Sequence, residues 1–278
     1  MSSPHACVAV AVDGSARDRT AVTWAAGAAA ARGLPLRLLH VAGHRFARTA
    51  AEAVDAAQDR ARDVAPDVPV ESRVLTGDTV AVLREHSRDA AVLVTAPHTG
   101  EPLESFGWST TAMLSVSATC PLVAVPPRRG PAETHGAVAV GVDGTALSEA
   151  ALAFAFEHAD AVGADLVAVH AWHDSAADRV EEDTGGIDRA ETERVQQRIL
   201  AEALAGWGEK FPDVRVRRIV AHGPPRAALL ARAATAQLLV VGTGGRAGLT
   251  GLLHGSTSQA LLHELRCPLA VVRTGVPG

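Results

Sequence analysis

The sequence predicts an α/β fold made of two tandem Rossmann-like repeats, each a doubly wound parallel sheet of five strands flanked by helices. Three observations predict this fold. Short apolar runs alternate with longer helical patterns, the pattern recurs in the second half of the chain, and 278 residues suffice for two domains of ordinary size. Hydrophobic residues make up 47% of the chain but aromatic residues only 3%, so small side chains can pack helices closely on a sheet.

The two halves of the chain share four segments in the same order, which indicates a duplicated domain. Between the copies lies PPRRGPAETHG (126–136), whose Pro and Gly content is typical of a linker. We therefore expect one domain over residues 1–127 and a second over 135–278. The matched pairs are 7–15 with 137–145, 36–44 with 166–174, 74–78 with 220–224, and 118–126 with 265–273, which align His40 with His170 and Cys120 with Cys267.

In the first repeat, continuous apolar runs predict buried strands near residues 6–12, 35–41, 70–75, 91–95 and 121–125, with helices between them. Strands that alternate with helices are joined by right-handed crossovers and form a parallel sheet covered on both faces. Ligands of such sheets bind in a crevice beyond the carboxyl ends of the strands, where the strand order reverses. Motifs that follow directly after strands are therefore the candidates for function.

The second repeat shows the same order of elements, with an acidic insertion near 172–190 that we expect to be a loop at the edge of the crevice. Strands are predicted over 135–143, 166–172, 214–221, 236–243 and 267–273. The spacing of Leu147, Ala151, Phe154 and His158 predicts a first helix. A second is predicted over 187–211, with Val195, Ile199 and Leu204 on one side. Two more are predicted over 225–235 and 255–265.

A glycine-rich loop follows the fourth strand of the second repeat. Gly242 and Gly245 lie three residues apart, and Gly255 precedes Ser256 and Thr257, which open a helix. A backbone without side chains lets phosphate oxygens approach its N–H groups, and the positive end of the helix dipole favours an anion. The hydroxyl groups could add donors, as could Thr243 in the loop, and Arg246 could add charge. The alternative is that the glycines only make turns and Ser256 only caps the helix.

Asp143 ends the first strand of the second repeat and is followed by Gly-Thr. Its carboxylate could face a ligand, or it could form an Asx turn or cap the next helix, and both roles are compatible. His170 lies inside the second strand of the repeat. We interpret it as a core histidine with satisfied hydrogen bonds rather than as a catalytic residue.

The pattern G-x2-G-x9-G-[S/T] after the fourth strand resembles the ATP-binding branch of the universal stress protein family, a group of the adenine-nucleotide alpha hydrolase-like fold. The opening V-D-G-[S/T] of Val142 to Thr145 and the closing CPLAVV are also similar to that family, and the likeness covers nearly the whole chain, once per repeat. The resemblance implies ATP as ligand, and Mg²⁺ would accompany the ATP. It also implies that Asp143 lies near the adenine and ribose, that Ala171 lines the adenine pocket and that Val241 packs on the base.

The first repeat has lost the glycine loop. In 94–111, Ala96 and Thr99 stand opposite the first two glycines and Trp108 stands opposite Gly255. A Trp would obstruct the approach of phosphate to backbone, and Glu101 and Glu104 would repel an anion. Asp13 and Ser109 are retained. We therefore expect one adenine nucleotide per chain, in the second repeat, and leave open a different ligand for the first.

Two classes of function remain. A nucleotide-binding regulator of the stress response is favoured, because neither a GK[ST] phosphate loop nor a GxSxG elbow is present. A slow ATPase or phosphotransferase is the alternative, with His254 or Asp143 positioning water or accepting a phosphoryl group. A receiver domain would need a Lys after its last strand, but the single lysine of the chain is Lys210. The phosphate count, and hence ATP against AMP or a cyclic nucleotide, is not encoded in the glycine spacing.

Composition excludes several partners. A formal net charge of −5 lacks the basic footprint of nucleic-acid binding. Neither a signal peptide nor an apolar run long enough to span a membrane is evident, and the three distant cysteines fit a reducing compartment, so we expect a cytoplasmic protein. The resemblance further implies that the last strands, 121–125 and 268–273, pair within the chain and cover each other's edges. Association of two chains stays open.

Overall fold

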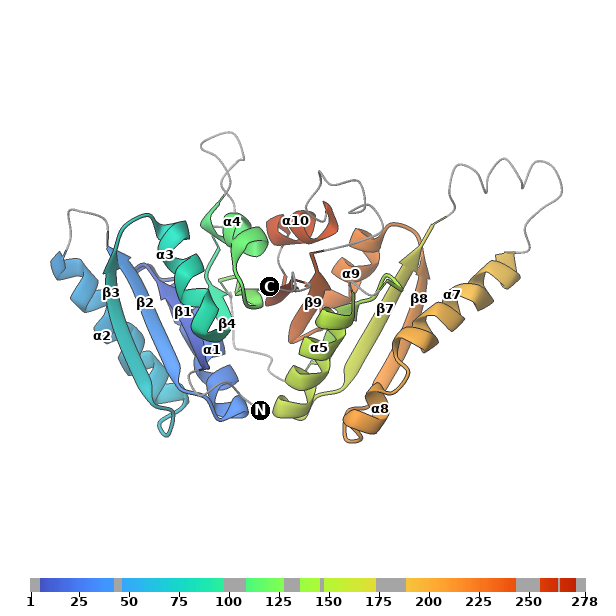
Figure 1. The fold of residues 1–278 in the computed structure, drawn as a ribbon, viewed down its shortest axis with the longest axis horizontal. Helices are drawn as coiled ribbons and strands as arrows, with labels where there is room; N and C mark the ends of the chain where they lie inside the picture. Colours follow the sequence, from blue (N-terminus) through green and yellow to red (C-terminus); the bar gives the residue numbers. More distant parts are fainter. Residues whose placement is uncertain are drawn as a thin grey trace. The chain divides into compact units, whose positions relative to one another are not determined.

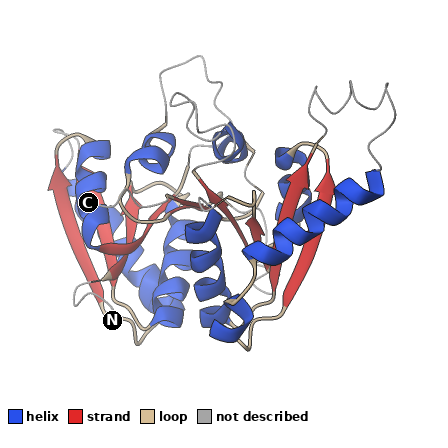
Figure 2. Cartoon of the chain, turned by 45° about the vertical axis from the view of Figure 1, so that its right-hand side comes forward, coloured by secondary structure: helices blue, strands red, loops and turns tan. Residues whose placement is uncertain are grey.

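The computed structural model describes residues 6–42, 47–97, 109–127, 136–145, 148–173, 189–243, 256–264 and 266–273 (Figure 1). The chain divides into two compact units. Residues 1–133 together with 265–278 form the first unit, and residues 134–264 form the second. Both are α/β units in which parallel strands are flanked by helices, as the sequence predicts (Figure 2).

The first unit contains the five strands predicted for the first repeat, in the spatial order β3-β2-β1-β4-β5. All four pairings along this order are parallel. The strands are β1 (Cys7–Val12), β2 (Leu36–Ala42), β3 (Val70–Thr76), β4 (Ala90–Thr95) and β5 (Leu122–Ala124), and the helices are α1 (Asp18–Arg32), α2 (Ala47–Val64), α3 (Thr79–His86), the short 3-10 helix η1 (Ser87–Asp89) and α4 (Thr110–Ser117).

The helices of the first unit cover its sheet in two pairs, α1 with α2 and α3 with α4. The central strands β1 and β4 are buried along almost their whole length, which explains why their sequences are continuous apolar runs rather than alternating ones. Helix α1 ends at Gly33, whose φ of +62° is the left-handed conformation that closes helices without steric cost. The chain then turns directly into β2.

A sixth strand completes the first unit. Strand β10 (Leu269–Val272) belongs by sequence to the second repeat, yet it lies in the first unit, where it pairs antiparallel with β5. Leu122 pairs with Val271 and Ala124 with Leu269. The predicted pairing of these two terminal strands is thus present. The guanidinium of Arg273 adds a hydrogen bond of 3.1 Å to the carbonyl of Ala118, just before β5.

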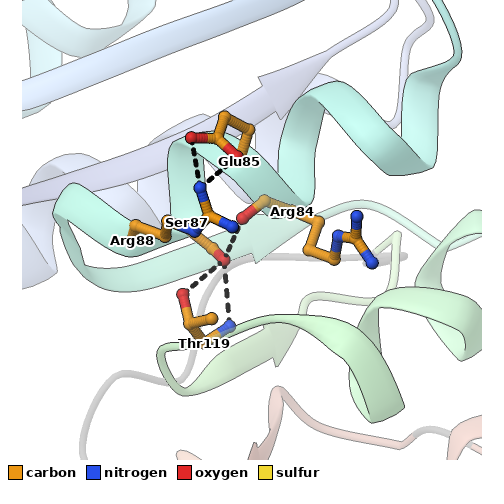
Figure 3. A network of polar contacts seen from close by, with 5 residues as sticks. All are labelled: Arg84, Glu85, Ser87, Arg88 and Thr119. Carbon is orange, nitrogen blue, oxygen red and sulfur yellow. Dashed lines mark hydrogen bonds and ion pairs between the residues drawn. The ribbon is translucent and has the colours of Figure 1, made fainter. Parts of the chain in front are cut away.

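A buried hydroxyl joins η1 to the turn before β5 (Figure 3). Ser87, 1% exposed, donates its only hydroxyl proton to the carbonyl of Arg84 at 2.6 Å. Its oxygen therefore accepts both bonds from Thr119, the N–H at 2.9 Å and the hydroxyl at 2.9 Å. Beside it, Arg88 and Glu85 form an exposed ion pair on the same helical stretch.

The second unit has four parallel strands in the order β9-β6-β7-β8. These are β6 (Val138–Gly141), β7 (Leu166–Trp172), β8 (Val216–His222) and β9 (Leu238–Gly242). Helix α5 packs on β6 and β9, α7 on β7 and β8, and α9 on β6 and β7. The helices are α5 (Glu149–Val162), α7 (Arg189–Ala203), α8 (Trp207–Lys210), α9 (Pro225–Ala233) and α10 (Ser256–His263).

One prediction for the second unit is wrong: residues 187–211 do not form a single helix. Helix α7 ends at Ala203, and Gly206, with φ of +77°, separates it from α8. A left-handed residue cannot continue an α-helix. The break lets Trp207 and Phe211 stack on the fully buried ring of Phe156, at centroid distances of 5.1 and 5.6 Å. Aromatic packing on α5 therefore decides where the helix ends.

Cys7, Cys120 and Cys267 are buried free thiols. Burial raises the pKa of the Cys120 thiol to about 12 and also raises that of Cys7, so both are protonated at neutral pH and unreactive. Within the described ranges, no three His, Cys, Asp or Glu side chains are grouped so that they could hold a metal ion. None of the helices described is both long and apolar enough to cross a bilayer.

Candidate functional site

The ends of three neighbouring strands of the second repeat place Asp143, Ala171 and Gly242 at one edge of its sheet. Strand β6 lies between β7 and β9, and its Val140 is level with Ala168 on one side and Val240 on the other. Because all three strands are parallel, the residues that follow them reach the same carboxyl edge. The order of strands reverses between β6 and β9. From β6 the chain continues to β7 and β8 on one side, and it returns later to form β9 on the other side of β6. Such a reversal is where sheets of this kind bind ligands.

Asp143 stands at the centre of this edge. One carboxylate oxygen, Oδ1, accepts the N–H of Thr145 at 2.9 Å and its hydroxyl at 2.7 Å, so the Asx turn, one of the two roles considered from the sequence, is present. The other oxygen, Oδ2, is buried, and no described residue donates a hydrogen bond to it. A buried carboxylate oxygen without a donor is costly, which makes it the atom of this site that most needs a ligand.

Gly144 completes the turn because no other residue fits. Its φ is +77°, and a Cβ at this position would collide with the side chain of Ile199 on α7. The glycine thus serves two purposes, a left-handed backbone and close approach of a helix. Helix α7 thereby lies directly against the turn that presents Asp143.

His170 connects the same turn to α7 through a second contact. The residue is 1% exposed. Its Nδ1 lies 2.7 Å from the carbonyl oxygen of Val142, and its Nε2 lies 2.9 Å from the side-chain amide of Gln196. A carbonyl oxygen only accepts, so Nδ1 carries the proton. The prediction of a satisfied core histidine is confirmed. The contact with Val142 also holds the backbone of the residue that precedes Asp143.

The remaining predicted residues fall into three groups. Val142 and Val241 are buried, each with 4% exposure. Ala171, Gly242 and Thr243 are half-buried at the carboxyl edge. Gly245, Arg246 and Gly255, together with His254, lie outside the described residues.

Helix α10 begins at Ser256, as predicted, and Thr257 in its first turn is half-buried. The first N–H groups of any helix lack partners within the helix, so the start of α10 offers donors after the glycine loop. An ion pair between Arg226 of α9 and Glu264 joins this helix to its neighbour. The far end of α10 is thereby tied to α9.

The matching edge of the first unit is built differently. Asp13 forms the same Asx turn, with its Oδ1 accepting the N–H of Ser15 at 2.8 Å. Here, however, Oδ2 of Asp18 accepts the N–H groups of both Asp13 and Gly14, at 2.9 and 2.7 Å. Burial of Asp18 and the neighbouring charge of Asp13 raise the pKa of Asp18 to about 6. Ser109 caps α4 by accepting the N–H of Ala112.

Ala96 follows β4 and is half-buried, whereas Thr99, Glu101, Glu104 and Trp108 lie outside the described residues. Sequence reasoning missed two features, the Gln196 contact of His170 and the role of Asp18. Only Asp18 has a signal in the duplicated sequence, because in the aligned turns it stands opposite Ser148.

Comparison with known proteins agrees with the duplicated fold. A family model described as the universal stress protein family matches residues 7–126 and, a second time, residues 136–273. A universal stress protein of Mycobacterium tuberculosis strain H37Rv is 34% identical over 289 residues, covering 96% of each chain. Another from the same strain is 32% identical over 293 residues, again covering 96% of each.

Solved structures show the same fold along the whole chain. A universal stress protein from Archaeoglobus fulgidus superimposes with a TM-score of 0.60 at 17% identity and covers 96% of this chain and 98% of its own. A functionally unknown protein from Pseudomonas aeruginosa PAO1 gives a TM-score of 0.64 at 18% identity, with coverage of 97% and 93%. With a double family match and relatives of the same length, the chain belongs to the universal stress protein family, as a tandem member.

Proposed function

We propose that the second repeat binds one adenine nucleotide per chain, and that the protein acts in the cytoplasm as a nucleotide-dependent regulator of the stress response. In this proposal the glycine loop from Gly242 through Gly245 to Gly255 holds the phosphates. The N–H groups and hydroxyls of Ser256 and Thr257, and the charge of Arg246, assist it. Val142, Ala171 and Val241 surround the base, and Thr243 lies at the entrance to the loop.

The observation that supports the proposal most directly is the buried Oδ2 of Asp143, which no described residue satisfies. Its partner atom Oδ1 is committed to the turn, so the carboxylate is held in one orientation. A fixed, desolvated acceptor selects a ligand group that donates, such as a sugar hydroxyl or an amino group on a base. Both groups are present in an adenine nucleotide.

A bound polyphosphate would bring Mg²⁺ with it. The described part of the chain offers no cluster of three metal ligands, so the cation would be held largely by phosphate oxygens and water, as Mg²⁺ commonly is. Regulation rather than catalysis is proposed because the sequence contains neither a GK[ST] phosphate loop nor a GxSxG elbow. Single-turnover measurement with labelled ATP addresses the alternative, and hydrolysis above the protein-free rate would replace the regulator with a slow ATPase or phosphotransferase.

The test uses two matched substitutions. Asp143→Asn keeps an oxygen for the Asx turn but puts an NH₂ donor where Oδ2 stands, so ATP affinity should fall by roughly 10- to 100-fold. Asp13→Asn makes the same change in the first repeat and should leave the affinity unchanged. Isothermal titration with ATP, ADP, AMP and cyclic AMP measures both variants and ranks the ligands. Equal affinity of the unaltered chain and Asp143→Asn would refute the assignment.

A further inference from the structure

The two repeats place the same turn after their first strands. Asp13-Gly14-Ser15 and Asp143-Gly144-Thr145 both close an Asx turn, at N···O distances of 2.8 and 2.9 Å. Their glycines have φ of +85° and +77°. The first helical segment then begins with the same backbone bond, from Asp18 N to Ser15 O at 3.1 Å and from Ser148 N to Thr145 O at 3.0 Å.

The turns differ in the side chain at one aligned position. Asp18 is 8% exposed, and its carboxylate points toward the preceding turn. There Oδ2 accepts two consecutive N–H groups, those of Asp13 and Gly14. Ser148, 5% exposed, turns its hydroxyl to the carbonyl of Thr145 at 2.8 Å. No described residue accepts a hydrogen bond from the N–H of Asp143 or Gly144. The same pair of amides is therefore filled by an anion in one repeat and left open in the other.

Consecutive backbone N–H groups in such a turn form a concave site that binds one anionic oxygen. We propose that Asp18 is a built-in anion that closes this amide pair in the first repeat and excludes polyphosphate ligands from it, whereas Ser148 keeps the second repeat open to them. The inference rests on the proposed function and extends it, because it identifies a specificity-determining residue that acts independently of the glycine loop.

Two physical effects make Asp18 an effective block. Its oxygen already satisfies both amides, so an incoming phosphate or sugar oxygen would have to displace a charge-assisted bond. Its charge adds to that of Asp13, the one charged side chain among the described residues that acts on it appreciably. Two carboxylates at the mouth of a site oppose an anion by like-charge repulsion. Ser148 does neither, since its hydroxyl is neutral and turned away.

Transplanting the carboxylate tests the proposal. Ser148→Asp should lower ATP affinity at pH 7.5 by about tenfold or more, because the new carboxylate takes both amides and repels phosphate. Ser148→Asn fills the amides without charge and should lose less, and Ser148→Ala should stay within about threefold of the unaltered chain. Unchanged thermal unfolding shows that each variant is folded. ATP binding by Ser148→Asp as tight as in the unaltered chain would overturn the proposal.

A second measurement needs no nucleotide. In the free protein, the backbone amide resonances of Asp13 and Gly14 should shift with pH as the Asp18 carboxyl titrates, and Asp18→Asn should abolish that shift. Amides that shift alike in both proteins would contradict the occupancy of the pair. If the unaltered chain binds no nucleotide at all, the proposed function fails, while this titration still decides whether Asp18 closes the turn.

Discussion

At the residue scale, buried polar side chains fix the turns at the two sheet edges: Asp18 is particular to the first repeat, whereas His170 has a counterpart in His40. Asp18 and His170 are both almost fully buried, and each satisfies backbone groups next to the aspartate that ends a first strand. Asp18 accepts from the amides of its turn, and His170 donates to the carbonyl before it. Burial of a polar group is tolerated only where it is paired, so each side chain commits the turn to one geometry.

Asp18 predicts a pH dependence of stability in the first unit. Its pKa is raised from 3.8 to about 6 in the folded protein, so the folded state binds the proton more tightly than the unfolded state. The stabilising contribution is complete below pH 4 and is lost as the pH rises through 6. Asp18→Asn does not titrate, so relative to it the unaltered chain should lose about 1–2 kcal/mol between pH 4 and 7, after allowance for solvent screening.

Urea unfolding at several pH values measures this difference, with the exposed Asp67→Asn as a control that should follow the unaltered chain. A difference between the unaltered chain and Asp18→Asn that does not vary with pH would show that the Asp18 carboxyl has the same pKa in both states.

His170 predicts a selective effect on ligand binding. His170→Leu removes the donor to Val142 and leaves a buried carbonyl unsatisfied, at a cost of about 1–3 kcal/mol. The substitution should also weaken nucleotide binding, because Asp143 directly follows Val142 in the chain and would be held less firmly. His170→Asn retains a donor near the place of Nδ1 and should recover most of the affinity. His40→Leu removes the equivalent bond to Val12, 3.0 Å long, and should leave nucleotide affinity intact. Titration calorimetry of the three variants would reveal a general packing defect if His40→Leu behaved like His170→Leu.

At the scale of elements, side chains that cross between segments decide where helices end and how strands are tied. Gly206 and the Phe156 stack split the long polar segment into α7 and α8. Ser87 ties the end of α3 and η1 to the turn that leads into β5. Neither link is visible as a periodic pattern, because each depends on residues far apart in sequence.

The Ser87 link predicts a measurable loss of stability. Ser87→Ala leaves the N–H and hydroxyl of Thr119 without their acceptor and should reduce the free energy of unfolding by about 1–3 kcal/mol. Ser117→Ala is the matched control, since Ser117 is only half-buried and its hydroxyl donates to the carbonyl of Met113 in its own helix. It should change stability by less than about 0.5 kcal/mol. Chemical denaturation measures the free energy of unfolding of both variants. An equal decrease in the two would mean that the buried Ser87 link adds no stability beyond that of an ordinary helix hydroxyl.

At the scale of the whole molecule, the duplicated chain has diverged into one unit proposed to bind nucleotide and one proposed to be closed to it. The divergence involves the loop after the fourth strand, where Trp108 replaces Gly255, and the turn after the first strand, where Asp18 replaces Ser148. Strand β10 shows that the repeats are not independent in structure either. It is encoded at the end of the second repeat and completes the sheet of the first unit.

This asymmetry predicts one nucleotide per chain. Equilibrium dialysis with labelled ATP should reach a plateau of one equivalent, and Gly255→Trp, which copies the first repeat, should abolish binding while the circular dichroism spectrum stays unchanged. The bulk of the indole would block the approach of phosphate to backbone amides. Two equivalent sites in the unaltered chain, or undiminished affinity in Gly255→Trp, would contradict the assignment of the repeats. Mass spectrometry of the purified protein identifies any nucleotide that it retains.

The sequence by itself determined the duplication, the order of strands and helices, and the edge of the sheet at which a ligand should bind. Continuous apolar runs and glycine positions are local properties, and they were sufficient for the ten strands that the structure describes and for the turn after Val142. Only the tertiary structure decided that Asp18 fills two amides, that His170 reaches Gln196, and that α7 stops before Gly206. Each of these depends on which distant groups come within hydrogen-bond or van der Waals range, and a linear pattern does not contain that distance.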